Sequence, residues 1–288
     1  MLSLAAASLH GTWNVLVKVS GNPMGTFQRA TNIAALAITP PTAVAWWLTG
    51  RPGFTPAAAG LAAASAALEL AYLWLLSTAY KRGELSVVYP IARGSAPLLA
   101  VVAGIVVLGE RLAPVQLIGV ALLLIGILAV TLPQTSGRAT MPALLTGVAI
   151  AAYTAVDRVG VRLSTPWLYG WLLIVLLASA LSVSMWMAPK FARRQASPIV
   201  SAQARISEEP RPVSWRQAAV VGTFMWGAYL MVLIALDIAP LSVVAPVRET
   251  AIVAVAVWGV WKLGERKRAR TKLLGAGATL IGVALLAL

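Results

Sequence analysis

The chain has 288 residues, of which 59% are hydrophobic and 11% are charged. Because roughly a quarter of the residues in a soluble domain are charged, this composition excludes a large soluble domain and indicates a membrane protein. The formal net charge of +14 comes from Lys and Arg residues scattered between apolar runs, and membrane topology explains this distribution better than nucleic-acid binding does.

Ten apolar runs follow one another along the chain. The bilayer core is about 30 Å thick, so a helix needs about 20 mostly apolar residues to cross it. The runs lack the alternation of membrane barrels, whereas helices satisfy their own backbone polar groups in lipid. The sequence therefore predicts an all-α integral membrane protein with ten transmembrane helices, near residues 2–18, 26–49, 56–80, 85–108, 112–132, 141–162, 166–189, 216–236, 240–261 and 272–288.

The first run is predicted to be retained as a helix. It lacks a basic leader and ends in WNVLVK rather than in a clear small-residue cleavage site, so it does not fit a secretory signal. The absence of cysteine excludes disulfides and thiolate metal sites. The chain also lacks an HExxH motif and a second histidine, so we expect no metal and no cofactor.

Three motifs occur twice, in the same order and at a nearly constant offset of 155 or 156 residues. They are LSVVYP at 85–90 with LSVVAP at 241–246, LGER at 108–111 with 263–266, and GVALLLIG at 119–126 with GAGATLIG at 275–282. Ordered matches at one offset indicate a tandem duplication. Its seam lies near PQTSGR, which gives two repeats, residues 1–138 and 139–288.

Each predicted repeat holds five helices, and this odd number inverts the second repeat in the membrane relative to the first. Such an inverted repeat places a solute site near the bilayer midplane, between halves that rock around it. Glu110 and Glu265, the acidic residues of the two LGER copies, are predicted to be equivalent structural residues of turns on opposite membrane faces.

The doubled pattern resembles the EamA-type branch of the drug/metabolite transporter superfamily. The resemblance rests on LSVVYP, LGERL and QLIGVALLLIG, on their second copies, and on the opening LHGTWNVLVK. It covers essentially the whole chain. It implies ten helices in two inverted five-helix repeats and the transport of small metabolites or drugs, and it leaves the solute open.

Charged side chains inside a span are costly unless they face a cavity or a partner. Five such residues are Glu69, Arg93, Asp157, Arg248 and Glu249. Arg93 and Glu249 occupy equivalent repeat positions, where they either pair structurally or bind the solute. Glu69 is expected to be functional, with a neutralised structural carboxyl as the alternative, whereas the adjacent Arg158 leaves Asp157 open to an interfacial role.

Helical spacing places other polar residues on the same faces as these charges. The predicted helices 1, 3, 4, 6, 8 and 9 then line a cavity, whereas helices 5 and 10 are peripheral. Pro90 and Pro246 are kinks or, beside the charged residues, paired hinges. The predicted solute-binding residues are His10, Trp13, Asn14, Glu69, Tyr72, Tyr89, Arg93, Tyr153, Asp157, Trp226, Tyr229, Arg248 and Glu249.

Some of these residues have a simpler interpretation. A single buried histidine such as His10 is commonly a hydrogen-bonded core residue, although histidine also titrates near neutral pH. The aromatic residues Trp13, Trp226 and Tyr229 either stack on a solute or pack within the bundle. Lys18 is expected to extend toward the membrane interface.

Transport of a small zwitterion such as an amino acid is the preferred hypothesis, because two arginines and two glutamates complement a carboxylate and an amine. Proton-coupled export of lipophilic cationic drugs is the alternative, with Glu69 or Asp157 as the coupling acid because helix 1 has none. A lipid flippase or scramblase also fits. An intramembrane enzyme is disfavoured, since no serine motif accompanies His10.

The expected partners are a small solute and membrane lipid, with no nucleic acid, and the expected assembly is a monomer or a homodimer. The expected location is a bacterial cytoplasmic membrane. The odd-numbered connections and their flanks carry 17 of the 23 Lys and Arg residues, the even-numbered ones carry 4, and Arg93 and Arg248 complete the total. The positive-inside rule therefore places both termini outside, whereas the resemblance implies cytoplasmic termini.

Overall fold

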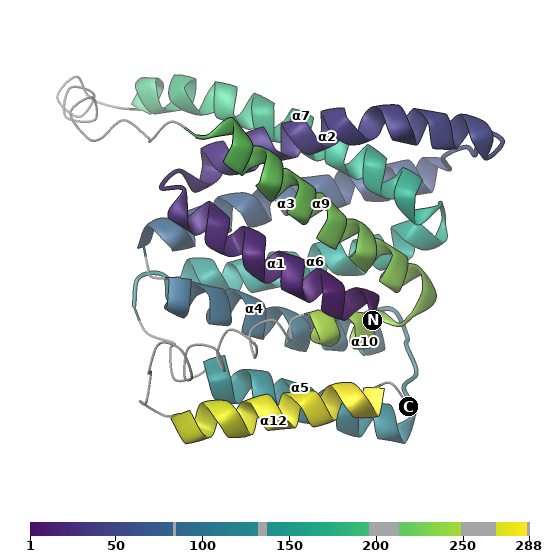
Figure 1. Cartoon of the computed structure of the whole chain (residues 1–288), viewed down its shortest axis with the longest axis vertical. Helices are drawn as coiled ribbons and strands as arrows, with labels where there is room; N and C mark the ends of the chain where they lie inside the picture. The colour runs from purple at the N-terminus through teal and green to yellow at the C-terminus, as the bar shows by residue number, and fades with distance from the viewer. Residues whose placement is uncertain (83–84, 132–136, 196–212, 249–268, 287–288) are drawn as a thin grey trace.

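The computed structural model describes residues 1–82, 85–131, 137–195, 213–248 and 269–286. All regular structure in these residues is helical (Figure 1), which confirms the all-α prediction. The helices are α1 (Leu2–Val19), α2 (Pro23–Leu48), α3 (Pro56–Arg82), α4 (Leu85–Val102), the π-helical turn η1 (Ala103–Val107), α5 (Pro114–Thr131), α6 (Thr140–Arg162), α7 (Pro166–Gln195), α9 (Trp215–Ile238), α10 (Leu241–Arg248) and α12 (Ala269–Leu286).

Helix starts follow local sequence signals. Proline is the first residue of α2, α3, α5 and α7, where its missing N–H costs nothing and its fixed φ suits the helix. The Asn22 side chain accepts a hydrogen bond from the Gly25 N–H at the start of α2 (3.0 Å), and the Ser214 hydroxyl accepts one from the Gln217 N–H at the start of α9 (3.5 Å). These side chains satisfy amide groups that the first helical turn leaves open.

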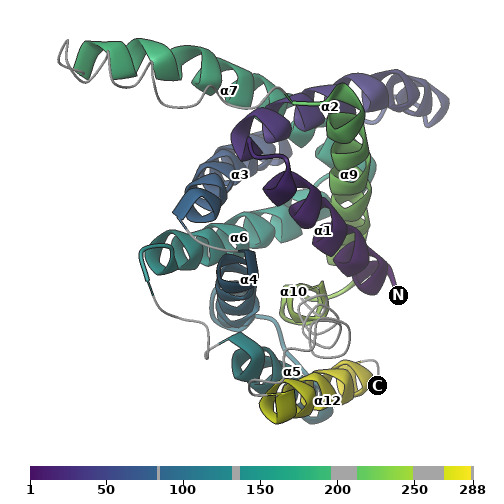
Figure 2. The same ribbon diagram turned by 60° about the vertical axis from the view of Figure 1, so that its left-hand side comes forward.

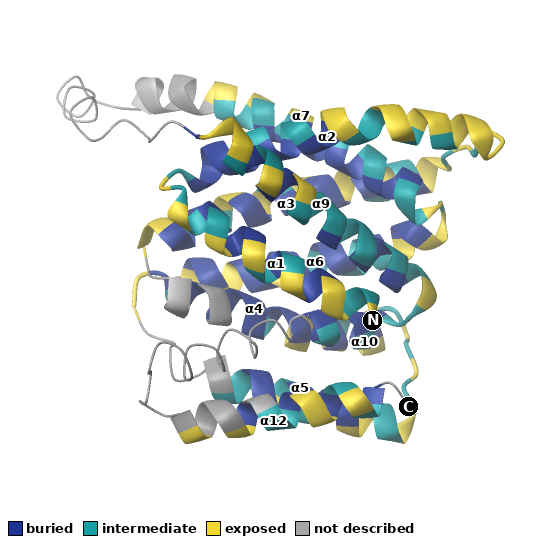
Figure 3. Ribbon diagram, in the orientation of Figure 1, coloured by how far each residue is buried: buried dark blue, intermediate teal, exposed yellow. Residues whose placement is uncertain are grey.

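Four of the described helices are long and apolar enough to cross a membrane: α3, α6, α7 up to Met187, and α9. Large apolar side chains also cover the outer surface, among them Leu36 and Val106, each 75% exposed. Figure 3 shows buried residues concentrated where helices meet and exposed residues along the outer faces. An exposed apolar surface of this extent is suited to contact with lipid.

The helices form stacked layers rather than one ring (Figures 1 and 2). Helix α1 packs on α9 and α3 packs on α6, while α2 contacts both α7 and α9, and α3 contacts α7. Helix α4 packs against α6 and α10, and α5 packs along α12 in a layer of its own at one edge. The central layers thus combine helices from both halves of the sequence.

Helices α5 and α12 are held together by glycines. A Cβ atom added at Gly119 would lie 2.9 Å from the Gly282 carbonyl oxygen, and one added at Gly126 would collide with the Gly275 carbonyl oxygen. Because position 119 meets 282 while 126 meets 275, the two helices run antiparallel. Small residues let helix backbones approach closely where lipid supplies no hydrophobic driving force.

Candidate functional site

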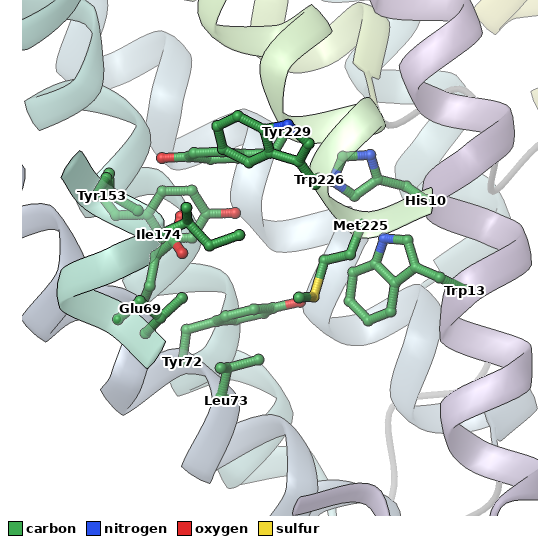
Figure 4. Close-up of a pocket in the computed structure, with 12 residues that line it drawn as sticks. His10, Trp13, Glu69, Tyr72, Leu73, Tyr153, Ile174, Met225, Trp226 and Tyr229 are labelled. Atoms are coloured by element: carbon green, nitrogen blue, oxygen red, sulfur yellow. The ribbon is translucent and has the colours of Figure 1, made fainter. Parts of the chain in front are cut away.

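A small cavity lies at the centre of the bundle, between helices α1, α3, α6, α7 and α9 (Figure 4). The volume open to the centre of a water molecule is about 40 Å³, which accommodates about three waters. A metabolite-sized solute therefore needs the helices to separate. The cavity is lined by His10, Trp13, Glu69, Tyr72, Leu73, Tyr153, Leu173, Ile174, Leu177, Met225, Trp226 and Tyr229.

Seven of these twelve residues were predicted from the sequence: His10, Trp13, Glu69, Tyr72, Tyr153, Trp226 and Tyr229. The structure also places Asn14, Arg93, Asp157 and Arg248 in the buried interior, but behind the lining rather than on it. Pro246 lies inside α10. The side chains of Tyr89 and Pro90, and the whole of Glu249, lie outside the described residues.

Asp157 is the centre of a hydroxyl network and is fully buried. Its Oδ1 accepts hydrogen bonds from the hydroxyls of Ser65 (2.6 Å) and Tyr169 (3.0 Å), and its Oδ2 accepts one from the Tyr229 hydroxyl (2.6 Å). This environment replaces the interfacial role considered for Asp157. The network ties α6 to α3, α7 and α9, and it reaches the cavity through Tyr229.

Glu69 is the acidic residue on the cavity lining. It lies on α3, one turn after Ser65, and is 9% exposed. Three tyrosines from α3, α6 and α9 (Tyr72, Tyr153, Tyr229) and two tryptophans from α1 and α9 (Trp13, Trp226) complete most of the wall. Figure 4 shows Glu69 and Tyr153 on one side of the cavity, opposite Trp13 and His10.

The wall formed by α1 presents nitrogen atoms to the cavity. His10 Nδ1 bonds to the Ala6 carbonyl oxygen (2.9 Å), so Nδ1 carries the hydrogen and the Nε2 of a neutral ring is an acceptor. The Trp13 side chain is buried, and its Nε1–H has no hydrogen-bond partner among the described residues. A buried donor that stays unsatisfied is costly, so this N–H is a natural contact for a bound solute.

Asn14 and Lys18 have structural partners instead. Asn14 donates to the His10 carbonyl oxygen (2.7 Å) and accepts from the Tyr80 hydroxyl (2.8 Å). Lys18 Nζ, expected to extend toward the interface, donates to the Tyr80 carbonyl oxygen (2.6 Å) at the C-terminal end of α3. The shared helical face of His10, Asn14 and Lys18 therefore combines one cavity residue with two residues that join α1 to α3.

Two buried arginines lie behind the cavity. Arg93 on α4 and Arg248 on α10 are each 2% exposed, and α4 packs against α10. Arg248 Nη1 donates to the Thr154 hydroxyl (3.4 Å). The positive charges of both arginines act on His10 and on Tyr153, which lie on opposite sides of the cavity (Figure 4), so they make the cavity as a whole more electropositive without lining it.

The sequence pattern did not indicate the contribution of α7. This helix supplies Leu173, Ile174 and Leu177 to the lining, whereas no described residue of α4 or α10 lies on it. The helices expected around the cavity were chosen because they carry charged and polar residues. A helix that contributes only apolar residues to the wall has no such pattern in its sequence. Tyr169, which donates to Asp157, was missed because it has no charged residue one turn away on its own helix.

The comparisons with known proteins concern family and fold. Residues 1–132 match the family model described as EamA-like transporter family, which confirms the resemblance on which the sequence interpretation rests. A solved crystal structure is similar over 99% of this chain and 94% of its own length, with a TM-score of 0.65 and 18% identity, so it shows the same fold. No curated protein matches the sequence.

Proposed function

We propose that this chain, whose residues 1–132 match the EamA-like transporter family, moves a small amine-bearing solute of amino-acid type across the membrane by alternating access. Members of that family are membrane transporters, and the apolar helices are those of an integral multi-pass protein. The observation that carries the solute proposal is the placement of the buried Glu69 carboxyl on the wall of an aromatic cavity.

The architecture proposed for this transport is a pair of inverted five-helix repeats, residues 1–138 and 139–288. The packing supports it. In this scheme α6, α7 and α9 are the repeat equivalents of α1, α2 and α3. The α1–α9 contact then corresponds to the α6–α3 contact, and the α2–α9 contact corresponds to the α7–α3 contact. Gly119 and Gly126 of α5 correspond to Gly275 and Gly282 of α12 at the 156-residue offset. In the antiparallel pair, Gly119 meets Gly282 and Gly126 meets Gly275. Inverted repeats rock around a site at the midplane.

Glu69 is assigned to the solute amine. A carboxylate binds an ammonium group through charge-assisted hydrogen bonds, and the surrounding faces of Tyr72, Tyr153 and Trp226 attract cations through their ring electrons. Leu173, Ile174 and Leu177 provide an apolar surface beside them. The site therefore suits a solute that carries an amine on an apolar or aromatic body.

The opposite wall is assigned to an acceptor group of the solute. The Trp13 indole N–H is a donor without a partner among the described residues, and the positive charges of Arg93 and Arg248 act on His10 of the same helix. A carboxylate or carbonyl oxygen on the solute satisfies the indole N–H and experiences the positive charge. Together the two walls favour a zwitterion that spans the cavity from Glu69 to Trp13.

Export of lipophilic cations in exchange for protons is the second candidate. The same aromatic and aliphatic lining and the same Glu69 carboxyl fit such a solute. The two candidates differ at Trp13, because a lipophilic cation has no acceptor for the indole N–H. Trp13→Phe, which keeps an aromatic ring and removes the N–H, therefore separates them.

The test is uptake into proteoliposomes of a panel of amino acids, their amides and lipophilic cations. We expect Glu69→Gln to lower uptake of amine-bearing solutes by about tenfold or more, because a hydrogen bond to a charged group contributes about 1.5–3 kcal/mol. Trp13→Phe is expected to lower amino-acid uptake and to spare lipophilic cations. Arg111→Gln, a change at an exposed charge outside the cavity lining, is the control. Undiminished uptake by Glu69→Gln would refute the assignment.

The proposed location is the cytoplasmic membrane of a bacterium, with both termini outside as the Lys and Arg distribution favours. A C-terminal fusion to a reporter that is active only in the cytoplasm tests the orientation. An inactive reporter on an expressed protein supports external termini, and an active one supports the opposite orientation.

A further inference from the structure

We propose that Glu110, the acidic residue of the first LGER motif, is the centre of a clamp between the two halves of the chain. The clamp closes the cavity at the end where α6 and α9 finish, and it has to open for solute to pass. This inference rests on the proposed alternating-access transport. It assigns to Glu110 a role beyond that of a structural turn residue.

The carboxyl group of Glu110 binds the N-terminus of α10. Its Oε1 accepts from the Leu241 N–H (2.6 Å), and its Oε2 accepts from both the N–H (2.9 Å) and the hydroxyl (2.7 Å) of Ser242. A carboxylate at this position satisfies amide groups that the first helical turn leaves open, and it interacts favourably with the helix dipole. The sequence motif does not show this partner, which lies 131 residues further along the chain.

Arg158 on α6 completes the clamp. Its Nε lies 3.6 Å from Glu110 Oε1, and the two side chains are only 13% and 8% exposed. Its Nη1 donates to the Leu236 and Asp237 carbonyl oxygens at the C-terminal end of α9. One arginine therefore connects the Glu110 carboxyl to the end of α9.

The clamp joins the halves rather than stabilising one of them. Glu110 belongs to residues 1–138, whereas its side-chain partners among the described residues, Arg158, Leu241 and Ser242, belong to residues 139–288. If the halves rock apart at this end, as alternating access requires, these contacts have to separate. If the partners of Glu110 lay in its own half, their contacts would stay intact when the halves move apart.

Glycine at position 104 makes room for the clamp. A Cβ atom added at Gly104 would lie 2.5 Å from Glu110 Oε2 and 3.2 Å from Ser242 Cβ. The Glu110 N–H also bonds to the Gly104 carbonyl oxygen (2.9 Å), after Gly109 has turned the chain with a φ of +64°. Gly104→Ala thus disturbs the clamp while leaving both charged groups in the protein.

The cavity and the clamp meet on consecutive residues of α6. Asp157 receives the Tyr229 hydroxyl at the cavity wall, and Arg158, about 100° further around the helix, contacts Glu110. A displacement of α6 when solute occupies the cavity therefore moves Arg158 relative to Glu110. This arrangement gives a direct route from occupancy to opening.

The native chain contains no cysteine, which permits a direct test by single-cysteine labelling. Met225→Cys on the cavity lining reports access, and the rate of its reaction with a polar maleimide is measured in purified protein. We expect Glu110→Gln and Gly104→Ala to raise this rate by about tenfold, the effect of losing hydrogen bonds to a buried charged group. Ser242→Ala, which removes one of the contacts, is expected to give a smaller increase.

Two controls separate opening from unfolding. Arg111→Gln changes the exposed neighbour of Glu110 and is expected to leave the labelling rate unchanged. Leu123→Cys, buried between α5 and α12, should label slowly in every clamp variant, whereas a rise there would indicate general loosening and count against a specific gate. Unchanged labelling of Met225→Cys in folded Glu110→Gln and Gly104→Ala proteins overturns the proposal.

The assay does not depend on which solute is carried. Glu69→Gln is expected to lose amine uptake without faster labelling of Met225→Cys, whereas the clamp variants are expected to label faster. If Glu69→Gln keeps amine uptake, only the solute assignment is contradicted. If the clamp variants do not label faster, only the clamp is contradicted.

Discussion

Removal of both hydroxyl donors from one oxygen of Asp157 is expected to cost more than the sum of the two single changes. Asp157 Oδ1 accepts from Ser65 and Tyr169 and is fully buried. In Ser65→Ala or Tyr169→Phe one donor remains, so each change should lower the free energy of unfolding by about 1 kcal/mol, a typical net hydrogen bond. In the double variant Oδ1 loses both of these donors, although Tyr229 still donates to Oδ2. The cost rises to about 4 kcal/mol because one oxygen of a buried charged group is left without these donors.

The assay is reversible unfolding in mixed micelles, followed by circular dichroism, for the wild type, both single variants and the double variant. The expected coupling between the two sites is about 2 kcal/mol, well above the additivity error of about 0.5 kcal/mol for independent sites. Thr31→Ala is the control partner for Tyr169→Phe, because the Thr31 hydroxyl donates to the Phe27 carbonyl oxygen of its own helix (2.7 Å) and is not part of the Asp157 network. Additive costs in the Ser65 and Tyr169 pair would refute the shared-acceptor reasoning.

Two further predictions concern glycines. Gly282→Ala is expected to destabilise the protein by about 1–3 kcal/mol, because its Cβ would lie 2.6 Å from the Gly119 carbonyl oxygen. Gly277→Ala, which has no atom within 4 Å, should instead stabilise the protein by about 0.5–1 kcal/mol. Unfolding of both variants in micelles measures these changes, and equal effects would contradict the packing of α5 on α12. Gly160→Ala would place a Cβ 2.6 Å from the Tyr169 hydroxyl and should lower the free energy of unfolding by about 2 kcal/mol. The same substitution should cost much less in a Tyr169→Ala background, and the same unfolding assay measures both. An equal cost in both backgrounds would mean that Tyr169 is not the obstruction.

Much of the fold was predictable because membrane helices leave a strong imprint on sequence. Length and apolarity locate α3, α6, α7 and α9, and prolines mark several helix starts. Charge inside a span located Glu69 and Asp157, since isolated charges are costly in lipid. The same rule was less informative about Arg93 and Arg248, because a buried charge signals a polar interior and does not say whether the side chain reaches the cavity.

The remaining site features depend on contacts between distant parts of the chain. Leu173 and Leu177 reach the cavity because of where α7 packs, and leucine in a span has no pattern that distinguishes a cavity wall from a lipid-facing surface. Glu110 was predicted to be a turn residue, and its position at the end of a span supports that much. Its partners Leu241 and Ser242 are set by the way the two halves meet, which no local motif specifies.

The two proposed repeats contain one contact that is equivalent in kind, though not in residue type. Lys18 on α1 donates to the carbonyl oxygen of Tyr80 near the end of α3, and Arg158 on α6 donates to that of Leu236 near the end of α9. The two acceptors are 156 residues apart, the same offset as LSVVYP and LSVVAP. In each proposed repeat the first helix is therefore joined to the third through a partly buried cation on a backbone oxygen. Contacts of this kind hold a half together as a unit, so the motion that opens the cavity is expected between the halves, where Glu110 lies.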